Sequence, residues 1–395
     1  MRPLAWLLLL ALLGTTALVG PGRDYSAYAV WWLTNSEPPE LALRGPAGPV
    51  RGTVEVPLEA RPSGRVDLLA ADVDGRELAP EPPPSAGSGQ ALRIDTTSLS
   101  DGEHLLSVQA QDRSLRHNAA SASLRLSSDN TPPSFEIRST PDNVPQGHTV
   151  VVHVHSNEPA EAQVRLDSAP LHLFPAGADY WAVLGVDSDE KPGPRELAVD
   201  GRDRVGNPGH AEGQLAVVPY KFTEDSIQVP ESLVPLLSPA VRAAEDERLL
   251  PVYQRDNGPP LWKGPFLLPV IGPISTEFGE VRSYNGRPFE GHHNGTDFQA
   301  GQGAPVQAPA RARVAFRDQV RLRGNILILD HGGGVYTTYA HLSEWLAEPG
   351  QEVEPGQPVA RVGSTGLSTG PHLHWELWIN GKSVDPVEWT QREVP

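Results

Sequence analysis

The chain has no cysteine among its 395 residues. This absence excludes disulfide bonds, thiolate metal sites, a cysteine nucleophile and an N-terminal lipid anchor on cysteine. It leaves the compartment open, because an exported protein can fold without disulfides. Basic residues are also scarce: 32 Lys and Arg stand against 49 Asp and Glu, for a formal net charge of −17. Such a chain has no bulk electrostatic attraction to nucleic acid or to an anionic membrane face.

The N-terminus lacks an apolar run long enough for a typical spanning helix. Residues 1–20 hold one positive charge, Arg2, then an apolar run that ends at Leu13, short of the roughly 20 residues a bilayer requires. Small residues follow, a pattern typical of a signal peptide. We therefore predict an exported protein of the periplasm or cell envelope. Its leader is either cleaved, with Ala17 in the best site, or kept as an anchor, the only case in which a membrane is a partner.

The composition otherwise indicates a folded chain of several domains, since 38% of its residues are hydrophobic despite 41 prolines and 38 glycines. Residues 25–130 are predicted to form an all-β sandwich. Apolar residues alternate there in three runs, at positions 54, 56 and 58, at 66, 68 and 70, and at 106, 108 and 110. Turn signals such as Asp101-Gly102 separate such runs, as in short-stranded sandwiches.

Residues 133–219 repeat this theme. The run after Gly193 matches the run after Gly102 at several offsets, and both end in an aspartate followed by a turn that contains asparagine. This weak internal repeat predicts two tandem sandwich domains of one type. They resemble the immunoglobulin-like domains of bacterial surface proteins. The second includes His153-Val-His155, which we interpret as one exposed face of a strand rather than a metal site.

Residues 222–262 differ from both domains. Prolines divide them into short turns, and one helix is predicted from Pro239 to Leu249. We interpret them as a connector that packs against the next domain; covering that domain's groove is the alternative.

Residues 265–390 are predicted to be antiparallel all-β, with loops that carry the chemistry. The predicted strands are 266–270, 312–316, 325–330, 335–340, 359–362 and 373–379. Two histidines one residue apart, His372 and His374, fall at the start of the last strand and project to one side of it. His293, Asp297 and His341 lie upstream. Three His/Asp ligands with one open position are the pattern of a catalytic zinc site.

Three segments together carry a specific resemblance. They are His293-Asn-Gly-Thr-Asp297, Tyr339-Ala-His341-Leu-Ser343 and Gly370-Pro-His372-Leu-His374. Their residues and order resemble the signature motifs of the lysostaphin/LytM-type zinc endopeptidases of bacterial peptidoglycan. The resemblance covers about a third of the chain and says nothing direct about the rest.

The resemblance implies a role for each of these five residues. His293, Asp297 and His374 would bind Zn²⁺ with a water in the fourth place. His341 and His372 would be the catalytic imidazoles, one handling the proton of the water and the other stabilising the oxyanion. The chain has no His-Glu-x-x-His segment, so the helix-borne glutamate base of that motif is absent. Glu376 is either a partner of His374 or a solvated strand residue, and His331 is predicted at a turn or rim.

Two functions follow from the resemblance. The first is an exported zinc metalloendopeptidase that hydrolyses peptide cross-links or stems of peptidoglycan. The alternative is a non-catalytic scaffold of the same family that binds the wall and recruits or activates another hydrolase. All five motif positions are present, which favours the enzyme. The sandwich domains are predicted to be spacers or arms that bind the wall or other envelope proteins. The sequence does not indicate which peptide bond is cleaved.

Overall fold

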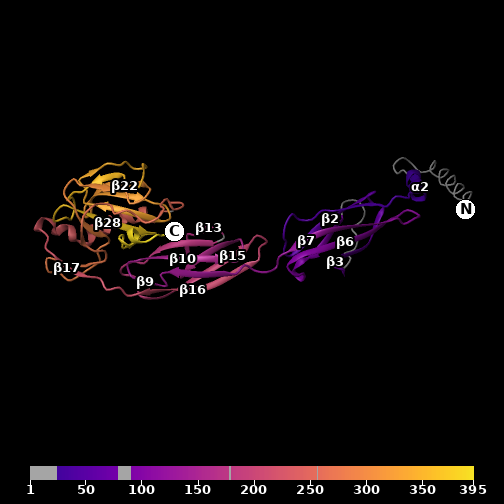
Figure 1. Cartoon of the computed structure of the whole chain (residues 1–395), viewed down its shortest axis with the longest axis horizontal. Helices are drawn as coiled ribbons and strands as arrows, with labels where there is room; N and C mark the ends of the chain where they lie inside the picture. The colour runs from indigo at the N-terminus through magenta and orange to yellow at the C-terminus, as the bar shows by residue number, and fades with distance from the viewer. Residues whose placement is uncertain (1–24, 79–89, 178, 256) are drawn as a thin grey trace, which may run out of the picture. The chain divides into compact units, whose positions relative to one another are not determined.

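Nearly all regular elements of the computed structural model are β-strands (Figure 1). The structure describes residues 25–78, 90–177, 179–255 and 257–395. The chain divides into two compact units. The first holds the described residues up to Pro132 with Arg202–Pro208, and the second holds Pro133–Gly201 with Gly209–Pro395. No helix in the described ranges is long and apolar enough to cross a membrane. The predicted leader at residues 1–20 lies outside them.

The first unit is built from two antiparallel sheets that share one buried core. Helix α2 (Tyr25–Thr34) precedes them, and a short helix η2 (Thr96–Ser98) follows β5. One sheet is ordered β1 (Glu40–Leu43), β2 (Thr53–Arg61), β5 (Gln90–Asp95), and the other β4 (Arg76–Glu77), β3 (Val66–Val73), β6 (Gly102–Asp112), β7 (Ala119–Ser128).

The predicted alternation is confirmed in β6 and wrong in β3. Leu106, Val108 and Ala110 of β6 are buried. In β3 Leu68 is exposed, and the register shifts between Leu68 and Ala70, so that the buried positions after the shift are Ala71 and Val73 rather than Ala70. A bulge adds one residue and so reverses the faces that follow it.

The second unit begins with another pair of sheets around one core. One is ordered β13 (Phe174–Ala176), β14 (Asp179–Gly185), β10 (Thr149–Ser156), β8 (Phe135–Thr140); the other β12 (Ala169–Leu171), β11 (Ala160–Leu166), β15 (Gly193–Asp203), β16 (Pro208–Val218), β9 (Asn143–Pro145).

The predicted repeat has a structural counterpart at the ends of β6 and β15. Asp112 accepts hydrogen bonds from the backbone and side chain of Asn118, and Asp203 accepts the same two bonds from Asn207. All four side chains close a turn just after their strand, which explains why aspartate and asparagine recur at these positions.

The rest of the second unit is built around one large sheet. Its order is β18 (Ile274–Thr276), β20 (Thr296–Gln299), β28 (His372–Ile379), β24 (Val335–Ala340), β23 (Gly324–Asp330), β22 (Ala312–Val320), β26 (Glu352–Val353), with β29 (Lys382–Val384) on β28. Smaller sheets join β21 (Pro305–Gln307), β27 (Pro358–Arg361) and β25 (Glu344–Trp345), and pair β17 (Glu224–Ile227) with β19 (Val281–Tyr284). Helices η3 (Glu231–Leu237), α3 (Pro239–Tyr253) and α4 (Glu388–Gln391) complete it.

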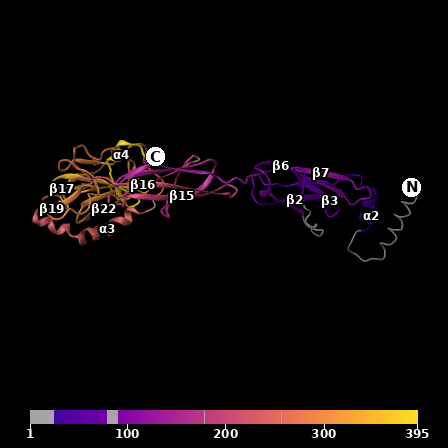
Figure 2. The ribbon, with the colours of Figure 1, turned by 90° about the horizontal axis from the view of Figure 1, so that it is seen from below.

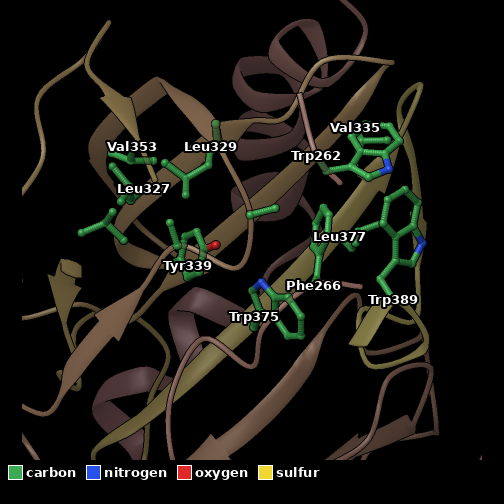
Figure 3. Close-up of a cluster of buried hydrophobic side chains, with 14 of the residues drawn as sticks. Trp262, Phe266, Leu327, Leu329, Val335, Tyr339, Val353, Trp375, Leu377 and Trp389 are labelled. Carbon is green, nitrogen blue, oxygen red and sulfur yellow. The ribbon is translucent and has the colours of Figure 1, made fainter. Parts of the chain in front are cut away.

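Both faces of this sheet are covered. On one face Tyr339, Trp375, Leu377 and Trp389 belong to a large aromatic and aliphatic core (Figure 3). On the other face lies helix α3 (Figure 2), whose Tyr253 ring stacks on Trp378 with centroids 4.4 Å apart. Every residue of β24 is therefore buried, including Thr337 and Thr338, so burial does not alternate along this strand.

The structure bears out the predicted connector helix and corrects one predicted strand. Helix α3 starts at Pro239 as expected, because Ser238 caps it by accepting from Val241 N, and it continues past Leu249 to Tyr253. Residues 266–270 are not a strand. Their backbone groups bond to separate segments, for example Phe266 N to Trp389 O, and proline within this stretch cannot donate to a ladder.

Candidate metal centre

Three side chains meet where β20 and β28 pair. Asp297 of β20 lies directly opposite His374 of β28, and His293 lies just before β20. Gly295 permits this approach: a Cβ there would be 2.4 Å from Trp375 O and 2.9 Å from His374 Cε1. The glycine of the His-x-Gly-x-Asp segment therefore lets the loop that carries His293 lie against β28.

Three potential ligand atoms of these side chains point at each other. His293 Nε2 is 2.9 Å from His374 Nδ1 and 3.1 Å from Asp297 Oδ1, and His374 Nδ1 is 2.7 Å from Asp297 Oδ1. All three side chains are at least nine-tenths buried. Side chains packed this closely in a dry site require a shared proton or a cation.

The other ring nitrogens indicate which atoms carry protons. His293 Nδ1 lies 3.0 Å from Glu277 O, and His374 Nε2 lies 2.8 Å from Glu376 Oε1. A carbonyl and a carboxylate accept, so these nitrogens are the donors, and in neutral rings His293 Nε2 and His374 Nδ1 keep their lone pairs. Two imidazole lone pairs and a carboxylate oxygen thus face one point, which is the donor set that zinc prefers.

The charges around the site favour a cation. Burial raises the pKa of Asp297, but its two imidazole neighbours outweigh burial and hold that pKa well below the ordinary value. Arg282 Nη2 binds the other oxygen of Asp297 at 2.9 Å. Burial lowers the pKa of His293 to about 4. Burial also lowers that of His374, but hydrogen bonds to Asp297 and Glu376 outweigh it and raise the pKa to about 9.

Two more imidazoles flank the group. The ring centroid of His341 is 4.7 Å from that of His372 and 5.8 Å from that of His374. His341 Nδ1 donates to Thr365 O at 2.7 Å and His372 Nδ1 donates to Gly370 O at 2.8 Å. In the neutral rings, Nε2 is thus the proton-accepting nitrogen. Burial, with the neighbouring imidazoles second, lowers the pKa of His341 to about 3.

The structure therefore brings together all five residues that the motifs predicted. They line one groove, and so do Asp225, Ile227 and Val229 of the connector. Strand β17 of the connector runs beside β19. The connector thus forms part of the groove wall as well as packing against the domain.

Several side chains outside the motifs were predicted wrongly or missed. Glu376 is fully buried, so the solvated alternative is wrong. His331 lies at the predicted turn, whose backbone is closed by the bond from His331 N to Val335 O, but it is fully buried, with Nε2 2.8 Å from Thr337 Oγ1, so only the rim alternative is wrong. The contact of Arg282 with Asp297 was not predicted. The contacts of Arg323 were not predicted either, because Glu245 and Glu376 lie far from it in the sequence. The predicted exposure of His153 and His155 on β10 is confirmed.

Comparison with known proteins tests the resemblance. Residues 291–386 match the model of peptidase family M23. This segment of the chain is an M23-like domain. This confirms the resemblance expected from the three motifs, and places all five site residues inside the matched segment.

Three proteins illustrate the similarity of this M23 domain. An uncharacterized metalloprotease of Haemophilus influenzae is 39% identical over 143 residues, 34% of this chain and 29% of that protein. The DD-carboxypeptidase/endopeptidase Mpg of Neisseria meningitidis is 46% identical over 95 residues, 24% of this chain and 22% of Mpg. The catalytic domain of lysostaphin from Staphylococcus simulans is 29% identical, with a TM-score of 0.28, 30% of this chain and 92% of that structure covered. The matched part thus spans less than a third of the first two relatives' own lengths.

Proposed function

We propose that this protein is a zinc metalloendopeptidase that hydrolyses peptide cross-links or stems of bacterial peptidoglycan in the cell envelope. The observation that carries the proposal is the convergence of two imidazole lone pairs and one carboxylate oxygen beside two further imidazoles. The relative Mpg bears the name DD-carboxypeptidase/endopeptidase, and a further relative from Vibrio cholerae, ShyA, bears the name peptidoglycan DD-endopeptidase.

His293, Asp297 and His374 would hold the zinc ion, through Nε2, Oδ1 and Nδ1. Bound zinc supplies a Lewis acid and lowers the pKa of a coordinated water to roughly 7. Arg282 orients Asp297 and Glu376 orients His374, each through a hydrogen bond to an atom that is not a proposed ligand atom.

His341 and His372 would handle the protons. Each ring is oriented by a backbone carbonyl that takes its Nδ1–H, which leaves Nε2 to accept a proton. One imidazole takes the proton of the attacking water, and the protonated ring then donates to the leaving amine. The other ring, when its Nε2 carries a proton, donates a hydrogen bond to the developing oxyanion. The low pKa of His341 keeps that ring neutral at pH 7 before the reaction.

For the remaining regions the proposal is coarser. The two pairs of sheets act as immunoglobulin-like spacers or as arms toward the wall or envelope proteins. The repeated aspartate–asparagine turn supports a common type for the two domains. Residues 1–20 act as the export signal or anchor.

Muropeptide mass spectrometry tests the proposal. The full chain is incubated with peptidoglycan sacculi, with and without a chelator, and zinc is then restored. We expect new peptide fragments that the chelator suppresses and zinc restores, and their masses identify the bond. A folded, zinc-loaded chain that releases no fragment, alone or with envelope proteins present, would contradict the enzyme and favour the scaffold alternative.

A further inference from the structure

A buried carboxylate on helix α3 connects the segment before the M23 match to the metal centre. Glu245 lies in the buried stripe of α3 formed with Val241, Leu249 and Val252, where an apolar residue would be expected. Its side chain is 2% exposed. It accepts from Leu322 N at 2.7 Å and from Arg323 Nη1 at 2.8 Å, both in the turn between β22 and β23.

Arg323 connects Glu245 to the surroundings of a proposed metal ligand and of a proposed catalytic residue. Its Nε donates to Glu376 Oε1 at 2.7 Å while its Nη1 donates to Glu245. Its carbonyl oxygen accepts from the backbone amide of His341 at 2.8 Å. His341 has a φ of 59°, a left-handed conformation that needs such backbone support. Arg323 therefore contacts both Glu376, the partner of the proposed ligand His374, and the backbone of His341, a proposed catalytic residue.

Glu376 completes the path. Its Oε1 accepts from His374 Nε2 at 2.8 Å as well as from Arg323, and its Oε2 accepts from Trp378 Nε1 at 2.7 Å. Because the carboxylate accepts a hydrogen bond from Nε2–H, the proton stays on Nε2 and Nδ1 is free to be the ligand atom of His374. Buried ion pairs contribute little net stability compared with well-packed apolar side chains. Packing alone therefore does not explain why three charged residues lie here.

We propose that Glu245, Arg323 and Glu376 form a positioning relay that fixes the tautomer and orientation of His374 for zinc binding. Glu245, the outermost member, comes from outside the segment that matches the family. The inference rests on the proposed zinc centre. It implies that helix α3 contributes to zinc affinity at that centre. Glu245 keeps the guanidinium of Arg323 shared between two carboxylates, so that Glu376 retains enough negative charge to hold His374 Nε2–H.

The test is the zinc dissociation constant of the full chain, measured by competition with a chelator. Glu245→Gln keeps the shape and an acceptor for Leu322 N but removes the charge. Outer-shell changes typically weaken metal binding 10–100-fold, and for this more distant residue we expect about 10-fold. Glu247→Gln is the matched control: it removes one charge from an exposed position of the same helix, and wild-type zinc affinity is expected.

If Glu245 had a purely structural role, Glu245→Gln would lower the melting temperature without changing the zinc affinity of the folded chain. Wild-type affinity in folded Glu245→Gln would therefore overturn the relay. If that variant does not fold, Arg323→Lys replaces it: lysine keeps the charge but has no fork to bridge two carboxylates. The same loss of affinity is expected, and wild-type affinity would again overturn the relay.

The outcome also separates the relay from the proposed function. A wild-type chain that binds zinc, with weaker binding in the variants, supports the relay even if no sacculus fragment is released. A wild-type chain that hydrolyses peptidoglycan while the variants bind zinc normally contradicts the relay alone. A wild-type chain that binds no zinc contradicts both.

Discussion

Two strands of the second unit carry the same His-x-His pattern, and their surroundings differ in burial and in the partners that converge on the histidines. On β10, His153 and His155 are exposed, and His155 forms a surface contact with Asp179 at 2.7 Å. On β28, His374 is buried, lies opposite Asp297 and has both ring nitrogens in contact with carboxylates. The comparison shows that the motif acquires chemistry from cross-strand and loop partners.

The largest expected effect comes from removal of a proposed ligand. His374→Ala leaves His293 Nε2 and Asp297 Oδ1 without their third partner, so zinc retention and hydrolysis are both lost. Because outer-shell changes alone weaken metal binding by about 10–100-fold, we expect more than about 100-fold weaker binding here. Metal content by mass spectrometry and fragment release from sacculi check this; activity that survives the change would contradict the ligand assignment.

A different signature is expected for an imidazole that handles protons. His341→Ala should retain zinc, because His341 is outside the ligand group, and should lower kcat by about 100–10,000-fold. The matched measurement of zinc content separates this variant from His374→Ala. Loss of zinc in folded His341→Ala would show that the two roles are not distinct.

An intermediate loss of zinc affinity is expected when Glu376, the hydrogen-bond acceptor of His374 Nε2, is changed. Glu376→Gln keeps the shape but weakens the acceptor of the Nε2 proton, and zinc affinity should fall by about 10–100-fold. Competition with a chelator measures it. Unchanged affinity in a folded variant would mean that the tautomer of His374 is fixed without the carboxylate.

Buried imidazoles should also make metal-free stability depend on pH. Burial lowers the pKa of His331 to about 4, against an ordinary value of 6.5, and that of His341 falls to about 3. The unfolded chain therefore takes up protons first, and stability present above pH 6.5 is lost as pH falls toward 4. Each group contributes a slope of up to about 1.4 kcal/mol per pH unit. Denaturant unfolding from pH 7 to 4.5 tests this; equal stability throughout would contradict it.

The smallest effect is expected at the exposed His-x-His. Simultaneous His153→Ala and His155→Ala should leave zinc content and fragment release unchanged and alter stability by less than about 1 kcal/mol, as is usual for surface positions. This double variant is the control for His374→Ala. Loss of one equivalent of zinc would show that exposure does not exclude a metal role at β10.

The gathering of the site was predicted from the resemblance of the three motifs to a known family, because no single motif contains all of its partners. The register that places Asp297 opposite His374 is seen only in the structure. Glu245 and Arg323 could not be predicted to reach the site, since their contact requires α3 to cross the turn before β23. The bulge after Leu68 was also not predicted, because residues 68–71 are all apolar and do not mark where the buried face changes.

The predicted strand at 266–270 and the predicted rim position of His331 failed for a related reason. The ring of His331 packs against Phe266 with centroids 4.9 Å apart, in a core that the chain assembles from distant loops. Periodicity reports which residues of one segment face the same way. It does not report which other segment covers them, and that partner decides whether histidine is a core residue, a rim residue or a ligand.

The most direct test of the central claim is anomalous diffraction at the zinc absorption edge from crystals of the zinc-loaded full chain. The account predicts one strong peak in contact with His293 Nε2, Asp297 Oδ1 and His374 Nδ1, with no peak at His153 and His155. A loaded chain whose zinc lies elsewhere, or contacts His374 through Nε2, would contradict the account.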